Sequence, residues 1–128
     1  MERMSKILVT PISRRTFVSG LVVQDLAPQR NATISVALSL DISYIDLNLA
    51  STNYLNAIGA ADAALYNRIP SDFTHLNAHG SELFGTMVSW LMTSSGTTKF
   101  GREIEEFSVA KQTIVEAIKE GVFTYPSV

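Results

Sequence analysis

The hydrophobic positions in the first half of the chain form two short apolar runs with a longer helical pattern between them. Residues 6–10 are apolar and β-branched and predict a buried strand, and residues 11–20, which begin with a proline, predict a loop. Residues 22–40 have apolar positions at helical spacing, and Pro28 fits best in a first turn. Residues 43–48 predict a second strand. Because a helical crossover joins parallel strands, this order predicts a parallel pair with a right-handed connection.

The second half of the chain is dominated by helical patterns. Short helices are expected at 51–58 and 60–66, and residues 67–75 predict a loop. The clearest helix begins after Asn77, a residue suited to the N-cap position. Its expected apolar face consists of Leu83, Phe84, Met87, Val88 and Leu91. These helices can supply the cover that both faces of a parallel sheet need.

The C-terminal part of the chain predicts a linker and one more helix. The linker covers residues 93–98, and the helix covers residues 102–119 and stops at Gly121. The expected buried side of this helix consists of Ile104, Phe107, Ile114 and Ile118. The order of the elements therefore predicts the α/β class in a single domain.

The composition narrows the class of protein. The chain has 128 residues, of which 46% are hydrophobic and 17% are charged, and the charged fraction is below the roughly 25% of a typical soluble domain. A net charge of −2 gives no electrostatic reason to expect nucleic acid or an anionic membrane as a partner. The absence of cysteine excludes disulfides, thiolate metal sites and a cysteine nucleophile. No apolar run is long enough for a secretory signal or a membrane span.

Asp72 and His75 are the candidate catalytic residues. They lie three residues apart in the predicted loop before the Asn77 helix. In such a loop the carboxylate can accept a hydrogen bond from the imidazole Nδ1–H, which leaves Nε2 as a base. The loops after Thr10 and Asn48 are expected nearby, at the carboxyl ends of the strands. The alternative is an ordinary solvated pair, because this spacing often arises by chance.

Two further groups of residues allow other interpretations. His75 and His79 are four residues apart with Glu82 beyond them, a spacing that can bind zinc on a helix, although Gly80 weakens a helix there. Arg14 and Arg15 are adjacent and could bind a carboxylate or a phosphate, or they could be solvated or paired with surface acids.

Six segments of the chain together form a recognisable set of motifs: residues 7–15, 24–27, 44–48 (Tyr-Ile-Asp-Leu-Asn), 50–52, 72–77 (Asp-Phe-Thr-His-Leu-Asn) and 80–85 (Gly-Ser-Glu-Leu-Phe-Gly). These segments closely resemble the SGNH (GDSL-type) hydrolases, and within them the rhamnogalacturonan acetylesterase branch. The resemblance covers residues 6 to about 92 well and the C-terminal helix loosely. It implies a three-layer α/β/α, flavodoxin-like parallel sheet, with Asp72 as the triad acid and His75 as the triad base. No cofactor or metal is implied.

The same resemblance implies that the site is incomplete in this chain. The nucleophile of the family lies in a Gly-Asp-Ser block, and no such block occurs here. The chain therefore resembles the C-terminal part of an SGNH domain that begins near its fourth strand, with a C-terminal linker and helix over about 93–128. The implied substrate is an acetylated polysaccharide or another small ester, and members of the family are extracellular. The alternative is a non-catalytic remnant that acts as an interaction or carbohydrate-binding module.

The implied truncation also predicts how the chain behaves in solution. An SGNH sheet without its first strands leaves residues 6–10 with an open side. An exposed apolar strand edge favours association with other strands. We therefore expect marginal stability, self-association, or a need for a partner chain.

Overall fold

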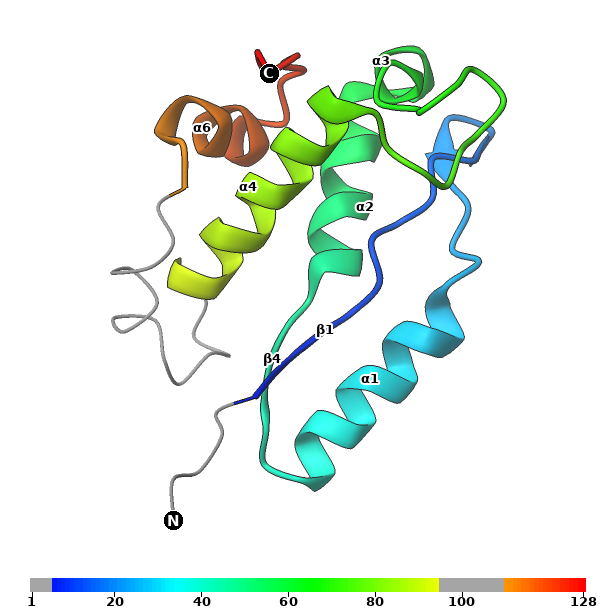
Figure 1. The fold of residues 1–128 in the computed structure, drawn as a ribbon. Coiled ribbons are helices and arrows are strands. Elements are labelled where there is room, and N and C mark those ends of the chain that lie inside the picture. Colours follow the sequence, from blue (N-terminus) through cyan, green and yellow to red (C-terminus); the bar gives the residue numbers. More distant parts are fainter. Residues whose placement is uncertain (1–5, 95–109) are drawn as a thin grey trace.

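A computed structural model of the chain describes residues 6–94 and 110–128. Strands β1 (Ile7–Val9) and β4 (Ser43–Ile45) form a parallel pair, and helix α1 (Ala27–Ser39) lies between them in the sequence and packs against both (Figure 1). The α/β class and the parallel pair with a helical crossover are thus confirmed. Among the described residues, the parallel sheet has these two strands.

A small β-hairpin precedes α1. Strands β2 (Phe17–Val18) and β3 (Leu21–Val22) pair antiparallel around Ser19 and Gly20, whose φ angles are 53° and 81°. Positive φ at both central residues is the geometry of a tight two-residue hairpin turn. Two expectations from the sequence were therefore wrong, because the segment before the turn is not all loop and the helix does not begin at Val22. Strands of two residues are too short to show the alternation of apolar and polar positions from which a strand is predicted.

The second strand is shorter than the predicted 43–48. It ends at Ile45, and helix α2 (Leu47–Ile58) begins almost at once. Asp46 terminates the strand because its side chain caps α2 and accepts a hydrogen bond from the Leu49 N–H at 3.3 Å. The prediction of a strand beyond Ile45 was therefore wrong, because the Asp46 carboxylate caps a helix there.

The Asp46 carboxylate also ties α1 and β1 to α2. Its Oδ2 accepts from Arg30 Nε at 3.0 Å, and its Oδ1 accepts from the Thr10 hydroxyl at 2.8 Å. Burial raises the pKa of Asp46, but the hydrogen bonds from Arg30, Thr10 and Leu49 outweigh burial and lower the pKa overall. This carboxylate therefore stays ionised and has a structural role.

The hydrophobic core lies among helices α2, α3 (Ala60–Ala64), α4 (Ala78–Ser94) and α6 (Gln112–Glu120). Its helical and aromatic members are Leu47, Tyr54, Leu55, Ala63, Tyr66, Leu83, Phe84, Met87, Ile114 and Ile118. The predicted apolar faces of the last two helices are confirmed where they are described. The first part of the predicted 102–119 helix, with Ile104 and Phe107, lies outside the described residues.

The ends of these helices follow the predicted signals. The Asn77 side chain accepts from the Gly80 N–H at 2.8 Å and caps α4, and Gly121 ends α6 in the left-handed region with φ 67°. Gly80 packs closely against the preceding loop, since an added Cβ would lie 3.0 Å from both Cβ and the carbonyl oxygen of Tyr66. None of the helices in the described ranges is both long and apolar enough to cross a membrane.

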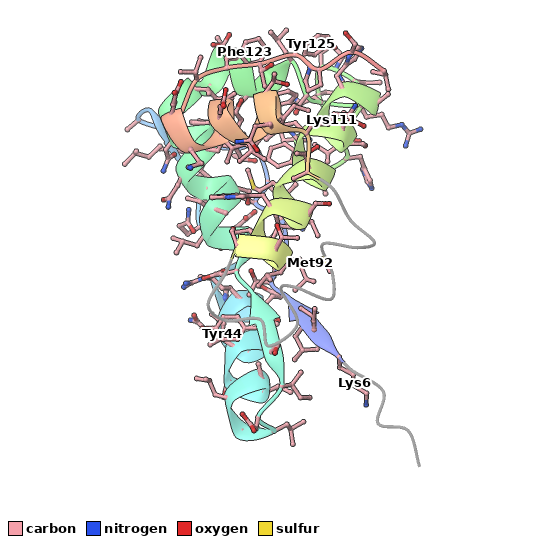
Figure 2. All side chains as sticks on the ribbon, turned by 90° about the vertical axis from the view of Figure 1, so that its left-hand side faces the viewer. Lys6, Tyr44, Met92, Lys111, Phe123 and Tyr125 are labelled. Atoms are coloured by element: carbon pink, nitrogen blue, oxygen red, sulfur yellow. The ribbon has the colours of Figure 1, made fainter. Side chains whose placement is uncertain are left out.

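The last residues pack over the helical core. Tyr54 Oη donates to the Val122 carbonyl at 3.0 Å, and Tyr66 Oη donates to the Thr124 carbonyl. Figure 2 shows Phe123 and Tyr125 at the end of the molecule opposite Lys6. The C-terminal segment thus closes the helical end, while the parallel strands lie at the other.

The open side of β1 is at the strand end of the molecule. Among the described residues β1 pairs only with β4, with Leu8 opposite Tyr44. Val9 is 44% exposed. An open edge of this kind was the basis for predicting self-association. The association itself stays a prediction.

Candidate functional site

The candidate site lies in the loop between α3 and α4. The two ends of this loop meet, because Asn67 and Leu76 form an isolated antiparallel bridge and the Asn77 N–H donates to the Tyr66 carbonyl at 2.9 Å. Within the loop, the Asp72 N–H donates to the Ile69 carbonyl at 3.0 Å. The loop is therefore a compact turn on the helical core, and the predicted loop at 67–75 is confirmed.

Asp72 and His75 are brought together within this loop. One carboxylate oxygen, Oδ1, accepts from the backbone N–H groups of Thr74 at 3.0 Å and His75 at 2.9 Å. The other, Oδ2, lies 2.9 Å from Nδ1 of the His75 ring. The expected contact between the two side chains is thus present. The Asp72 carboxylate therefore holds the backbone of the loop through Oδ1 and orients the His75 ring through Oδ2.

The electrostatics favour an ionised Asp72. The N–H groups of His75 and Thr74 and the contact with the His75 ring lower the pKa of Asp72 to about 2. The carboxylate is therefore charged at neutral pH, and its Oδ2 can accept a hydrogen bond from an Nδ1–H of the His75 ring. Its contribution to loop stability is fully present above the unfolded pKa of about 4 and is lost as the pH falls through about 2.

The His75 ring points to solvent. The His75 side chain is 68% exposed and the Asp72 side chain is 20% exposed. Within residues 6–94 and 110–128, no hydroxyl forms a hydrogen bond to Nε2 of His75. The described residues therefore present an oriented base without a nucleophile beside it.

The serine in the turn after β1, Ser13, does not contact the dyad. It is buried, its hydroxyl donates to the Arg14 carbonyl at 2.9 Å, and its N–H donates to Ser51 Oγ at 3.0 Å. Its hydroxyl therefore serves the turn after β1 and does not contact His75. Asn48, near the same turn, donates to the Pro11 carbonyl at 2.9 Å.

The zinc interpretation does not fit the geometry. Helix α4 begins at Ala78, so His75 and His79 do not share a helical face. His79 Nδ1–H donates to the Pro126 carbonyl at 2.6 Å, and Glu82 forms an ion pair with Lys111. The described residues contain no group of three histidine or acidic side chains placed to hold a metal.

The two adjacent arginines have different environments. Arg14 is partly exposed and forms an ion pair with Asp25 at 2.9 Å, as the alternative of pairing with a surface acid predicts. Arg15 is only 2% exposed and contacts the dyad loop, where its Nη2 donates to the His75 carbonyl at 2.6 Å. The segment after β1 therefore lies at the site as expected. The expected loop after Asn48 is wrong, because that residue lies within α2.

Comparisons of the chain with models of protein families, with curated proteins and with solved structures found no significant match.

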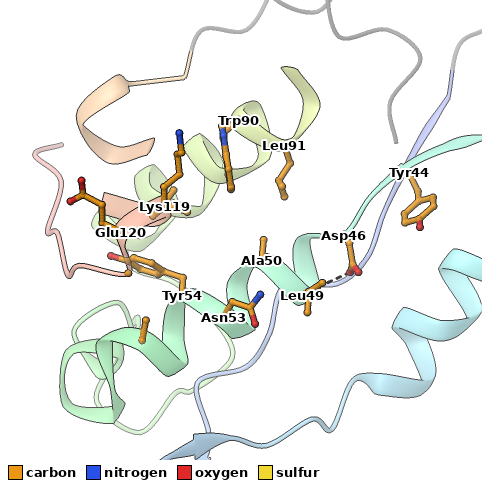
Figure 3. A pocket seen from close by; sticks show the side chains of 13 residues that line it. Tyr44, Asp46, Leu49, Ala50, Asn53, Tyr54, Trp90, Leu91, Lys119 and Glu120 are labelled. Carbon is orange, nitrogen blue, oxygen red and sulfur yellow. Dashed lines mark hydrogen bonds between the residues drawn. The ribbon is translucent and has the colours of Figure 1, made fainter. Parts of the chain in front are cut away.

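A separate pocket of about 800 Å³ lies between α2, α4 and α6. Figure 3 shows Trp90 and Leu91 on one side and Ala50 and Tyr54 on the other. Neither Asp72 nor His75 lines it. Leu91, from the predicted apolar face of α4, and its neighbour Trp90 are partly buried against the core and also line this pocket.

Sequence reasoning missed Arg15 and Asn67 as parts of the site. Arg15 Nε donates to Asn67 Oδ1 at 2.5 Å, and Asn67 is 6% exposed. The two residues are 52 positions apart, so no local pattern joins them. The one available signal was that a charged pair lies in the loop after a strand, at the edge where parallel sheets place their functional side chains.

Proposed function

We propose that this chain carries the acid–base part of an SGNH-class ester hydrolase, whose complete site deacetylates a pectic polysaccharide of the rhamnogalacturonan type. The observation that carries the proposal is the 2.9 Å contact between Asp72 Oδ2 and His75 Nδ1, with 68% of the His75 side chain exposed. The resemblance of residues 72–77 and 44–48 to that family supports the substrate class. The parallel β1–β4 pair is compatible with the three-layer sheet of the class.

The proposed chemistry is acyl transfer through a serine supplied from outside the described residues. Nε2 of His75 takes the proton of the serine hydroxyl while Oγ attacks the acetyl carbonyl carbon. His75 then gives this proton to the sugar oxygen as its bond to the acyl carbon breaks. A water molecule repeats the sequence on the acyl-serine and releases acetic acid. Asp72 stays ionised throughout and stabilises the imidazolium.

Complementation tests this function. The chain is combined with the Gly-Asp-Ser-bearing N-terminal part of a rhamnogalacturonan acetylesterase, and acetate release from acetylated rhamnogalacturonan is measured together with labelling by a fluorophosphonate. We expect acetate release and one serine adduct only when both parts are present. Equal release by the N-terminal part alone would contradict the proposal.

The pocket between α2 and α4 favours a second candidate, a non-catalytic carbohydrate-binding module. Aromatic side chains stack on sugar rings, and this pocket is lined by Tyr44, Tyr54 and Trp90 with the amide of Asn53 beside them. Trp90 is the only tryptophan of the chain, so its fluorescence reports directly on this pocket. Saturable quenching by acetylated pectic oligosaccharides, lost in Asn53→Ala, would support this candidate, and an unchanged spectrum would remove it.

A further inference from the structure

Arg15 lies beneath the loop that carries the dyad and contacts it at three points. Its backbone N–H donates to the Phe73 carbonyl at 2.9 Å. Its Nε donates to Asn67 Oδ1 at 2.5 Å, and its Nη2 donates to the His75 carbonyl at 2.6 Å. One side chain from the turn after β1 therefore holds the first residue of the loop and the catalytic candidate together.

These contacts fix the peptide groups on both sides of an exposed ring. The His75 carbonyl accepts from Arg15 Nη2 and also from the Arg68 N–H at 3.1 Å. The His75 N–H donates to Asp72 Oδ1. Because the backbone of His75 is held from both directions, the ring can remain on Asp72 although solvent surrounds most of it.

Fold stability alone gives a poor reason for this arginine. Burying a guanidinium costs several kcal/mol unless all of its donors are satisfied. Within the described ranges, Arg15 Nη1 and Asn67 Nδ2 are buried without a hydrogen-bond partner, and no carboxylate forms an ion pair with Arg15. A pair of apolar side chains of similar volume at positions 15 and 67 would fill the same space without a buried guanidinium.

We propose that Arg15 is a positioning residue for the His75 imidazole. It holds the peptide of His75 so that Nδ1–H stays on Asp72 and Nε2 stays bare and directed outward. This inference rests on the proposed function, because the orientation of the ring matters only if Nε2 acts as a base. It adds a residue, 60 positions from His75, that contacts neither the substrate nor the nucleophile.

The test reads the ring of His75 directly in the 128-residue chain. The ¹⁵N resonances of the ring, recorded at a pH where the imidazole is neutral, show which nitrogen carries the proton. We expect the Nδ1–H tautomer in the wild type and in Arg14→Met, the matched control on the partly exposed neighbour. In Arg15→Met we expect most of that population to shift to the Nε2–H tautomer, with Arg15→Lys in between. Amide spectra of α2 and α4 establish that each variant is folded.

A purely structural arginine would leave the tautomer of every folded variant unchanged, and that result would overturn the proposal. If Arg15→Met does not fold, the tautomer of Arg15→Lys is compared with the wild type instead, and an unchanged tautomer there overturns the proposal. The wild type adds a second requirement. An anchored guanidinium gives separate, exchange-protected Nη resonances for Arg15 and one averaged signal for Arg14, whereas averaged signals from both would overturn the proposal. None of these readouts needs hydrolysis. A failed acetate assay with the expected tautomers would therefore reject the proposed function and leave the positioning intact.

Discussion

The two histidines of this chain lie four residues apart and have opposite surroundings. His75 is in an exposed loop, and its Nδ1 contacts the carboxylate of Asp72. His79 is half-buried at the start of α4, where its ring stacks on Tyr125 at 4.0 Å between centroids and its Nδ1–H donates to the Pro126 carbonyl. Two histidines close together in the sequence therefore lie in different environments, one in a loop and one in a helix.

The difference lies in the partner of Nδ1 and in what surrounds the rest of the ring. A carboxylate stabilises a positively charged ring far better than a carbonyl does, and an exposed ring leaves Nε2 accessible to a substrate. A stacked ring bonded to a carbonyl instead fastens the C-terminal segment to the core. The contacts of His79 therefore give it a structural role, whereas the chemical role of His75 remains our proposal.

Replacing each histidine with alanine should separate an effect on activity from an effect on stability. The loss of activity in His75→Ala is the largest effect that we expect. In the complemented esterase, His75→Ala should lower kcat for acetate release by about 10³–10⁶, because the base is lost. His79→Ala should leave kcat unchanged. Near-wild-type turnover in His75→Ala would remove this residue from the mechanism.

Asp72→Asn should have the next largest effect on activity. An amide in place of the carboxylate cannot stabilise the imidazolium and favours the wrong tautomer, so kcat should fall by up to about 10⁴. The matched control is Asp62→Asn, in the first turn of α3 outside the dyad loop, which should retain activity. A loss smaller than about tenfold would mean that Asp72 only folds the loop.

His79→Ala should have the larger effect on stability. It removes the hydrogen bond to Pro126 and the contact with Tyr125, which should lower the free energy of unfolding by about 1–2 kcal/mol. His75→Ala should change it by less than about 0.5 kcal/mol, because the ring is exposed. Urea titrations of both variants measure this difference. Equal losses would show that the two regions do not divide these roles.

The strand end of the molecule offers a smaller effect. If chains associate through the open side of β1, Val9→Lys should weaken association about tenfold, because a charged residue on an edge strand opposes pairing. Leu65→Lys, an exposed apolar position next to α3, is the control for a general change in surface charge. Sedimentation velocity over a range of concentrations measures both. A monomeric wild type at every concentration would end this prediction.

The sequence was most informative where a single local signal decides the structure. Pro28, Asn77 and Gly121 each marked a helix end correctly, and the spacing of Asp72 and His75 predicted their contact. These outcomes depend on neighbours within four residues.

The sequence was least informative where distant residues decide the structure. The strand expected at 43–48 ends at Asp46, because Arg30 and Thr10 hold that carboxylate as a helix cap. The sequence left the role of Arg15 open, because its partners Asn67 and His75 meet it only in the folded chain. Among the described residues, no serine hydroxyl lies at Nε2 of His75, where the proposed mechanism needs one.

The orientation of the His75 ring is the central claim, and its ¹⁵N spectrum at a pH where the ring is neutral tests it most directly. With Asp72 intact, we predict a protonated Nδ1 and a bare Nε2, and in Asp72→Ala we predict that this preference disappears. A wild-type ring with its proton on Nε2, or one that Asp72→Ala leaves unchanged, would contradict the account.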